Sequence, residues 1–186
     1  WVYTFTDLRK TDDEGNEIIY TVAEVDNLEA NYTVTVGDTT NDGSTISQTI
    51  TNKENVGQIT VTKRVMNYGA DITSSANGTY YFVIKQGNDG YVSSDGSVKA
   101  YKDSTCIYSI QTGSYDQATY SKTISNLTYG KTYTIIEVDK AGNEIDTSKV
   151  NYQITYENEN ILIDKDNVSG NATIINTLNT TEKKVY

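Results

Sequence analysis

"QITVTKRVM", residues 58–66, alternates apolar and polar side chains as a β-strand with one buried face does. Ile59, Val61 and Val65 share the apolar face, and the remaining member of that face is Lys63. Lysine is almost never fully buried without a partner, because its ammonium group loses its hydration. Two interpretations follow. Either Lys63 lies on an edge strand and extends its side chain to water, or it has a buried polar partner.

The composition of the 186-residue chain excludes several kinds of functional site. A net charge of −10 argues against nucleic acid and anionic membranes as partners, because both attract basic surfaces. The absence of histidine excludes histidine-dependent triads and histidine metal sites, and the single Cys106 excludes an internal disulfide framework and a cysteine-based zinc site. No apolar run reaches the length of a membrane span, so no membrane insertion is expected in this segment. Neither a cofactor nor a metal is expected.

Short alternating segments, separated by Gly, Asn and Asp turns, recur along the whole chain. No segment keeps a helical period over three turns. Proline is absent, whereas Thr, Tyr, Val and Ile are abundant, which favours strands. Expected strands include residues 1–8, 17–26, 131–139 and 172–178. The pattern predicts an all-β fold, and strands of this spacing usually form a sandwich.

An internal repeat indicates two units of one domain type. The segment IIYTVAEVDN (18–27) matches KTYTIIEVDK (131–140), because both contain Tyr-Thr-x-x-Glu-Val-Asp. Each is followed by a strand that ends in an Asn/Thr pair, and the second unit has the longer insertion before that strand. We therefore expect tandem units at residues 1–55 and 56–180, a short junction at 53–57, and a linker or tail at 181–186.

Three predicted core strands each carry one polar residue on a mainly apolar face. Glu137 shares its face with Tyr133 and Ile135, and Asn176 also lies among apolar neighbours. Together with Lys63 these residues supply a carboxyl, a carboxamide and an amine, which suggests a site rather than an isolated buried charge.

These three groups can form a covalent bond. Burial can shift a pKa by up to about 3–5 units, and a neutral Lys63 amine is a nucleophile. A protonated Glu137 can hydrogen-bond the amide oxygen of Asn176 and polarise its carbon. Attack by the amine then releases ammonia and leaves a Lys63–Asn176 isopeptide bond, with the strands supplying a high effective concentration. The alternative is a hydrogen-bonded Lys63–Glu137 ion pair with Asn176 as a bystander.

The segments WVYTFTDL, DEGNEIIYTVAEVD, ITVTKRV, ISNLTYGKTYTIIEVD and ATIINT resemble the collagen-adhesin B-type (Cna-B) domain, an immunoglobulin-like β-sandwich module of Gram-positive surface adhesins and pilins. The resemblance covers nearly the whole chain and is specific for the second unit. It implies an isopeptide bond between a lysine on the first strand and an asparagine on the last, catalysed by the glutamate of the Tyr-Thr-x-x-Glu strand. Matched to this sequence, these residues are Lys63, Asn176 and Glu137.

The first unit departs from this pattern. It contains Glu24 and Asn52, but no lysine on a strand before Glu24, and the only earlier lysine is Lys10 in a loop-like segment. We therefore expect an immunoglobulin-like sandwich in two tandem units, of which the first is incomplete at its N-terminus. Its missing strands are absent from this chain or are supplied by a neighbouring one. Residues 1–52 should then expose an apolar face and an unpaired strand edge.

The sequence predicts a structural stalk or backbone segment of a surface adhesin or pilus, located outside the bacterial cell at the cell wall. Its partners would be adjacent domains or subunits of the same assembly, and a covalent tie between first and last strands suits such a role. The alternative is a ligand-binding adhesin module, whose long loops at 66–80 and 86–106 bind a host protein or glycan. A turnover enzyme is the least favoured class, because candidate catalytic residues are few.

Overall fold

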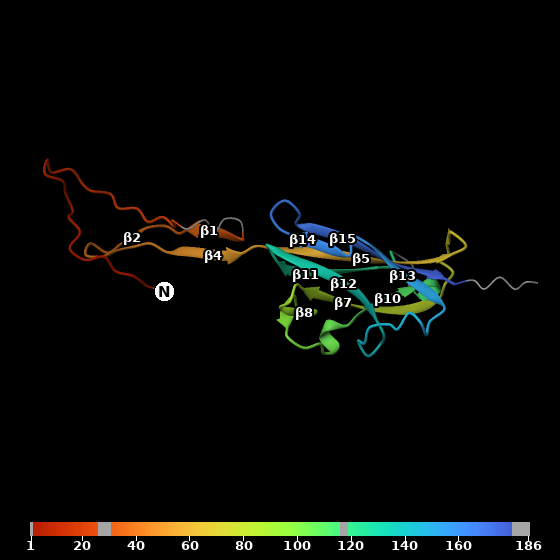
Figure 1. The fold of residues 1–186 in the computed structure, drawn as a ribbon. Coiled ribbons are helices and arrows are strands. Elements are labelled where there is room, and N and C mark those ends of the chain that lie inside the picture. The colour runs from red at the N-terminus through yellow and green to blue at the C-terminus, as the bar shows by residue number, and fades with distance from the viewer. Residues whose placement is uncertain (1, 26–30, 116–118, 180–186) are drawn as a thin grey trace, which may run out of the picture.

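The computed structural model describes residues 2–25, 31–115 and 119–179. From residue 56 onward the chain forms two facing β-sheets (Figure 1), which confirms the predicted all-β sandwich. Among the described residues the helical elements are two short 3₁₀ turns, η1 (Ser104–Cys106) and η2 (Gly113–Tyr115).

One sheet has six strands, in the order β14-β12-β7-β8-β9, with β10 also paired to β7. Its strands are β7 (Gly78–Gln86), β8 (Gly90–Val92), β9 (Val98–Lys99), β10 (Tyr108–Thr112), β12 (Lys131–Val138) and β14 (Asn160–Ile163). The other sheet has five strands, in the order β11-β5-β15-β13, with β6 also paired to β5. Its strands are β5 (Val56–Asn67), β6 (Ala70–Asp71), β11 (Ser121–Thr128), β13 (Tyr152–Glu157) and β15 (Ser169–Leu178).

The first and last strands of the sandwich, β5 and β15, are direct neighbours. They pair in parallel, with Ile174 opposite Lys63 and Asn176 opposite Val65. Because side chains alternate along a strand, Lys63 and Asn176 project from the same face of the sheet. β5 lies between β11 and β15, so the interpretation of Lys63 as an edge-strand lysine is wrong.

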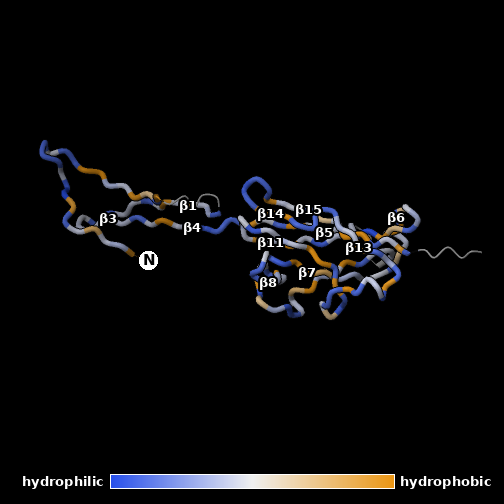
Figure 2. Tube along the Cα trace, in the orientation of Figure 1, coloured by the Kyte–Doolittle hydropathy of each residue, from blue (hydrophilic) through white to orange (hydrophobic). Residues whose placement is uncertain are grey.

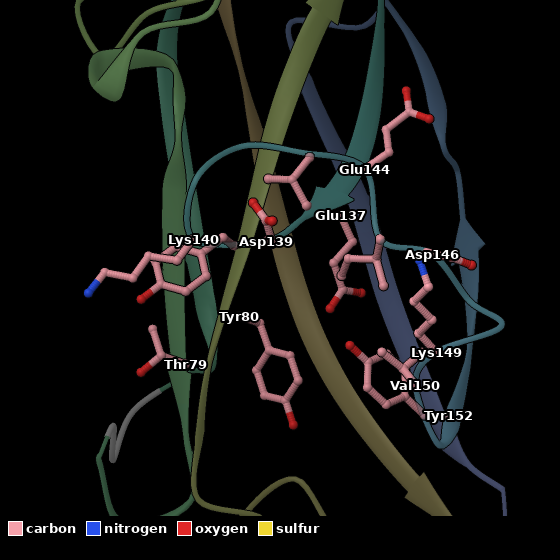
Figure 3. A pocket seen from close by; sticks show the side chains of 13 residues that line it. Thr79, Tyr80, Glu137, Asp139, Lys140, Glu144, Asp146, Lys149, Val150 and Tyr152 are labelled. Carbon is pink, nitrogen blue, oxygen red and sulfur yellow. Dashed lines mark ion pairs between the residues drawn. The ribbon is translucent and has the colours of Figure 1, made fainter.

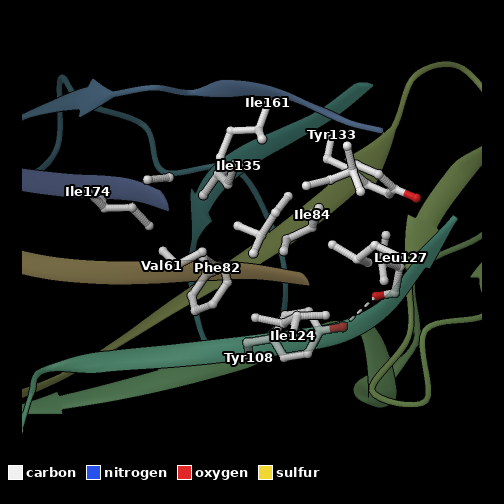
Figure 4. Close-up of a cluster of buried hydrophobic side chains, with 14 of the residues drawn as sticks. Val61, Phe82, Ile84, Tyr108, Ile124, Leu127, Tyr133, Ile135, Ile161 and Ile174 are labelled. Atoms are coloured by element: carbon white, nitrogen blue, oxygen red, sulfur yellow. Dashed lines mark hydrogen bonds between the residues drawn. The ribbon is translucent and has the colours of Figure 1, made fainter. Parts of the chain in front are cut away.

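Apolar side chains from the buried faces of the alternating strands fill the space between the two sheets, as predicted. Along β5 the buried side chains are every second residue, from Ile59 to Val65, and those between them are partly or fully exposed. They pack against side chains of the facing sheet, including Phe82 (Figure 4), whose ring stacks on Tyr108 at 5.2 Å between centroids. Removing such apolar surface from water stabilises the fold by about 25 cal/mol per Å² and holds the two sheets in one relative position.

The two long loops contain more regular structure than the sequence indicated. Residues 66–80 include β6, and residues 86–106 include β8, β9 and η1. The Asp103 side chain accepts a hydrogen bond from the backbone N–H of Thr105 and so caps η1. Many polar groups of these two segments therefore form hydrogen bonds within the fold itself.

Upstream of β5 the chain forms two small sheets. β1 (Tyr32–Val36) pairs with β4 (Ile50–Glu54), and β2 (Thr40–Asn41) pairs with β3 (Ile46–Ser47). In Figure 1 these strands lie beyond one end of the sandwich, and β4 leads into β5 through Asn55. The backbone N–H of Asn55 donates to Asn31 O at 2.8 Å, so the connection is tied to the strand pair.

The strands expected at residues 1–8 and 17–26 do not form in the described part of the chain. Residues 2–25 contain only an isolated bridge between Thr11 and Glu17. Their alternation suits a sheet, but no neighbouring strand supplies the backbone hydrogen bonds that a sheet requires. The expected exposed apolar surface is present, as the orange segments near the N-terminus in Figure 2 show. Its side chains include Val2, Tyr3, Phe5, Leu8, Ile19 and Val25.

The tail predicted at residues 181–186 lies outside the described residues. In the part of the chain that the structure describes, no helix has the length and apolarity needed to cross a membrane.

Candidate functional site

The three predicted site residues of the sandwich meet in its interior. Lys63 on β5 and Asn176 on β15 project from the five-stranded sheet, and Glu137 on β12 projects from the facing sheet. Their exposed fractions are 1%, 1% and 3%. The cluster therefore connects the two sheets and brings the first strand of the sandwich to the last.

The Glu137 carboxyl group is shared by the other two side chains. Lys63 Nζ donates to Glu137 Oε2 at 3.0 Å, and Asn176 Nδ2 donates to Glu137 Oε1 at 2.9 Å. One group thus holds the amine and the carboxamide next to each other. Asn176 is a bonded member of the cluster, which does not fit the bystander role of the ion-pair interpretation.

The carboxamide of Asn176 presents its nitrogen to Glu137, whereas the sequence had predicted that its oxygen faces this carboxyl group. Asn176 Oδ1 is buried and has no hydrogen-bond partner among the described residues. Leaving a buried acceptor unpaired costs about 1–3 kcal/mol. A half-turn of the carboxamide about its Cβ–Cγ bond exchanges the two atoms, and Oδ1 can then accept a hydrogen bond from a protonated Glu137.

Burial lowers the pKa of Lys63 from 10.5 to about 8, and the nearby Glu137 opposes part of this shift. The cause is the lost hydration of the ammonium group. The neutral amine, which is the nucleophilic form, is therefore more populated at neutral pH than in an exposed lysine. The ring of Tyr80 lies 4.5 Å from Lys63 Nζ and stabilises the ammonium form by a cation–π interaction.

Three tyrosines that sequence reasoning did not identify surround the cluster. They are Tyr80, Tyr152 and Tyr156. The hydroxyl of Tyr156 accepts a hydrogen bond from the backbone N–H of Glu137 at 3.0 Å and so helps to position β12. Burial raises the pKa of all three hydroxyls, which stay protonated at neutral pH. The chain has 16 tyrosines, and their sequence positions give no reason to select these three.

An open cleft of about 490 Å³ reaches the cluster from the surface. Figure 3 shows the Glu137 carboxyl group pointing toward the rings of Tyr80 and Tyr152 within it. The charged side chains that also line the cleft are Asp139, Lys140, Glu144, Asp146 and Lys149. Glu137 therefore lines a cleft that is open to solvent, although its own side chain is almost fully buried.

The two candidate residues of the first unit also meet. Asn52 Nδ2 donates to Glu24 Oε1 at 3.0 Å, which is the arrangement that Asn176 makes with Glu137. Glu24 Oε2 is buried and has no partner among the described residues. Lys10, the lysine that precedes Glu24, donates instead to Gly43 O at 3.1 Å.

Residues 1–53 match the family model of the Cna protein B-type domain. This match confirms the family resemblance drawn from the sequence. It falls on the first unit, whereas the resemblance was expected to be specific for the second, which carries the longer insertion between β12 and β15. No curated protein matches the chain.

Several solved structures are similar to the chain. The pilus-presented adhesin Spy0125 (Cpa) is 16% identical, with a TM-score of 0.41, over 69% of this chain and 28% of that one. A Mobiluncus mulieris adhesin containing intramolecular disulfide, isopeptide and ester bond cross-links is 17% identical, with a TM-score of 0.38, over 74% and 45%. The major pilin subunit BcpA of Bacillus cereus is 18% identical, with a TM-score of 0.38, over 74% and 35%. The chain thus spans less than half the length of each of these proteins.

Proposed function

We propose that this chain is a stalk or backbone segment of a bacterial surface adhesin or pilus, and that an autocatalytic isopeptide bond between Lys63 and Asn176 stabilises it. The observation that carries the proposal is the buried cluster in which Glu137 is hydrogen-bonded to both of the groups to be joined. An amine and a carboxamide held by one carboxyl group between two sheets are already positioned for reaction.

In the reactive form Lys63 is neutral and Glu137 carries a proton. This form differs from the ion pair only in the position of one proton along the 3.0 Å hydrogen bond. After the half-turn of the carboxamide, Glu137 donates to Asn176 Oδ1 and polarises the carbonyl group. Lys63 Nζ then attacks Asn176 Cγ to form a tetrahedral adduct.

Collapse of the adduct breaks the bond between Asn176 Cγ and Nδ2. Glu137 moves a proton from the attacking nitrogen to the departing one, so that ammonia leaves and the carboxyl group remains protonated. One C–N bond forms and one breaks, with no oxidation and no cofactor. Ammonia leaves through the cleft that Glu137 lines, which removes the reverse reactant.

A permanent ion pair accounts for the cluster less well. Transferring two charges out of water costs several kcal/mol per ion, and the pair leaves Asn176 Oδ1 without a partner. The reaction replaces the ammonium and the carboxylate with a neutral amide and a neutral carboxyl group. It therefore removes the energetic cost that makes a buried lysine uncommon.

The stalk role follows from what the bond connects. It closes a ring of covalent bonds from β5 to β15 and holds together the two ends of the sandwich. The family match over residues 1–53 and the descriptions of similar proteins as a pilus-presented adhesin and a major pilin support this role.

The proposed role implies a location at the outer surface of a Gram-positive cell, with adjacent domains or subunits as partners. The chain is not a turnover enzyme, because each molecule reacts once.

We assign residues 1–55 to the C-terminal half of a first Cna-B-like unit and residues 56–180 to a complete second unit. The repeat and the separate sheets before and after Asn55 support this division. The alternative role, binding through the long loops, is less favoured. Backbone hydrogen bonds such as Ser94 N to Thr105 O at 3.0 Å already tie these loops to their own fold.

Intact-mass spectrometry tests the proposed bond. The purified chain should be lighter than its formula mass by one ammonia, and digestion should yield a branched peptide joining Lys63 to Asn176. The Lys63→Met variant, which keeps an unbranched side chain but lacks the amine, should show its full formula mass. A folded parent chain at full formula mass would rule out the bond.

A further inference from the structure

One backbone N–H group of β12 is bound by a side chain instead of by a neighbouring strand. Ile135 and Asp139, two positions before and after Glu137, each donate their backbone N–H to a backbone carbonyl, at 3.0 and 2.8 Å. N–H groups two residues apart point to the same edge of a strand, so the N–H of Glu137 lies between them on this edge. It donates to the hydroxyl of Tyr156 at 3.0 Å. The proposed catalytic residue is thus held at its backbone by a tyrosine.

Tyr156 belongs to the opposite sheet, on the strand that also pairs with Asn176. In the β13–β15 pair Tyr156 lies opposite Ile174, and Ile174 lies opposite Lys63 on β5. These three residues therefore form one row across the inner face of the five-stranded sheet. Ile154, two positions before Tyr156, lies opposite Asn176. β13 thus contacts both the strand that carries the carboxamide and the strand that carries the carboxyl group.

The chain crosses from one sheet to the other directly after Tyr156. β13 ends at Glu157 and β14 begins at Asn160, and between them Asn158 has a positive φ of 53°. Asparagine adopts this left-handed conformation more readily than most residues, so the crossing is short. The crossing brings Tyr156 beside the edge of β12 that β14 pairs with farther along, where its hydroxyl reaches Glu137.

We infer that Tyr156 is a positioning residue for the Lys63–Asn176 bond, because its hydroxyl holds the backbone of Glu137 where one carboxyl group reaches both the amine and the carboxamide. The inference rests on the proposed function, since it concerns the rate of that reaction. Tyr156 acts through Glu137 and transfers no proton itself.

The positions of the two sheets decide whether the cluster can react. The two hydrogen bonds of the Glu137 carboxyl group, at 3.0 and 2.9 Å, both cross the space between the sheets. Burial of apolar side chains holds the sheets together but is non-directional, whereas a hydrogen bond requires a defined distance and angle. A misplacement of about 1 Å can slow a reaction about 100-fold. A hydrogen bond from one sheet to the backbone of Glu137 therefore favours the reactive geometry.

Refolding of the unreacted chain measures the rate of reaction per folded molecule. The full chain is recovered unfolded in urea from inclusion bodies, its full formula mass is verified, and dilution starts folding. Circular dichroism gives the folded fraction, and the intact mass of acid-quenched samples gives the loss of ammonia. Tyr156→Phe keeps the ring but removes the acceptor. We expect it to react about 10–100-fold more slowly than the parent at equal folded fraction.

Tyr152→Phe is the matched control, because it removes a hydroxyl from the same strand beside the same cleft. It should react at the rate of the parent. Refolding all chains in sucrose, which favours the folded state, keeps the comparison valid if a variant is destabilised.

Hydrogen exchange at the backbone amide of Glu137 reports the contact directly. It is measured in Asn176→Ala, which cannot react, with and without Tyr156→Phe. The Glu137 amide should exchange faster in the double variant, whereas the Ile135 amide, bound to a backbone carbonyl, should keep its protection. A general loss of stability would instead speed exchange at both amides.

These measurements separate the inference from the proposed function. A parent chain that loses ammonia, with Tyr156→Phe reacting equally fast per folded molecule, would overturn the inference alone. Equal slowing in Tyr152→Phe, or unchanged exchange at the Glu137 amide, would also overturn it. A folded parent chain that never loses ammonia would overturn the proposed function, and the inference with it.

Discussion

At the scale of single residues, the ammonium group of Lys63 carries a large desolvation penalty, because the residue is only 1% exposed. Glu137 accepts a hydrogen bond from this ammonium group and another from Asn176. In the proposed reaction the same carboxyl group would both offset the buried charge and catalyse its removal. A buried charge that loses its only partner typically destabilises a protein by about 3–5 kcal/mol. Changes at Glu137 must therefore be interpreted both as chemistry and as electrostatics.

Replacing Glu137 should abolish the bond. Glu137→Ala should restore the full formula mass and lower the melting temperature, because the chain loses a closure that contributes about 4–5 kcal/mol by analogy with a disulfide closing a loop of roughly 100 residues. Glu137→Gln keeps the size of the side chain but cannot carry the proton, and it should also show full mass. Glu144→Ala, at an exposed residue lining the same cleft, is the matched control and should keep the bond. A complete bond in either Glu137 variant would show that another group moves the proton.

The pKa of Lys63 predicts a pH dependence in a chain that cannot react. In Asn176→Ala, the folded state releases the Lys63 proton near pH 8, whereas the unfolded state keeps it to about 10.5. The unfolded state thus binds more protons in this window, so the free energy of unfolding should rise by about 2–3 kcal/mol from pH 8 to 10. Urea denaturation at several pH values measures it.

The control for this prediction is the same chain with Lys63→Met added, which should lack the rise. Above about pH 10 the partly buried tyrosines, whose pKa values are raised, should lower the free energy of unfolding in both chains, because folding then opposes their ionisation. An equal slope in the two chains between pH 8 and 10 would mean that Lys63 is not the titrating group.

At the scale of elements, the face on which a side chain lies decides whether it can react. Asn176 and Ile175 are neighbours on β15, but the first is buried and the second partly exposed. The double variant Ile175→Asn with Asn176→Ile exchanges their faces and keeps the composition. It should fold, since an apolar side chain enters the core, yet it should be heavier than the parent by one ammonia. Intact mass of both chains measures this difference, and equal masses would contradict the assigned face of Asn176.

The alternation of residues 58–66 predicted a strand with Lys63 on its apolar face, but it did not show whether that strand lies at an edge or, as β5 does, between two neighbours. The equally clear alternation of residues 17–26 did not lead to a strand in the described residues, since a pattern identifies a surface that can pair but does not supply its partner. The sequence also identified the three groups of the cluster from their shared apolar faces. It did not give the orientation of the Asn176 carboxamide or the positions of Tyr80 and Tyr156, which depend on contacts between facing sheets.

At the scale of the whole molecule, the proposed bond turns residues 63–176 into a closed ring. A protease recognition sequence inserted after Asp166, in the exposed turn between β14 and β15, allows this ring to be opened at one point. After cleavage the parent should remain one covalent species on a denaturing gel, because the bond still joins the two pieces. The same insertion in Lys63→Met should give two fragments. Two fragments from the parent would show that no ring exists.

The parallel pairing of β5 and β15 also determines how the sandwich responds to tension. The chain enters along β5 and leaves along β15, so stretching its ends slides these neighbours in opposite directions and stresses all their backbone hydrogen bonds together. With Lys63 joined to Asn176, tension passes from one strand to the other at that point. Residues 64–175 then bear no tension. They therefore cannot be pulled out into extended chain, which would add about 3.5 Å of length per residue. A filament built from such units would transmit force without lengthening.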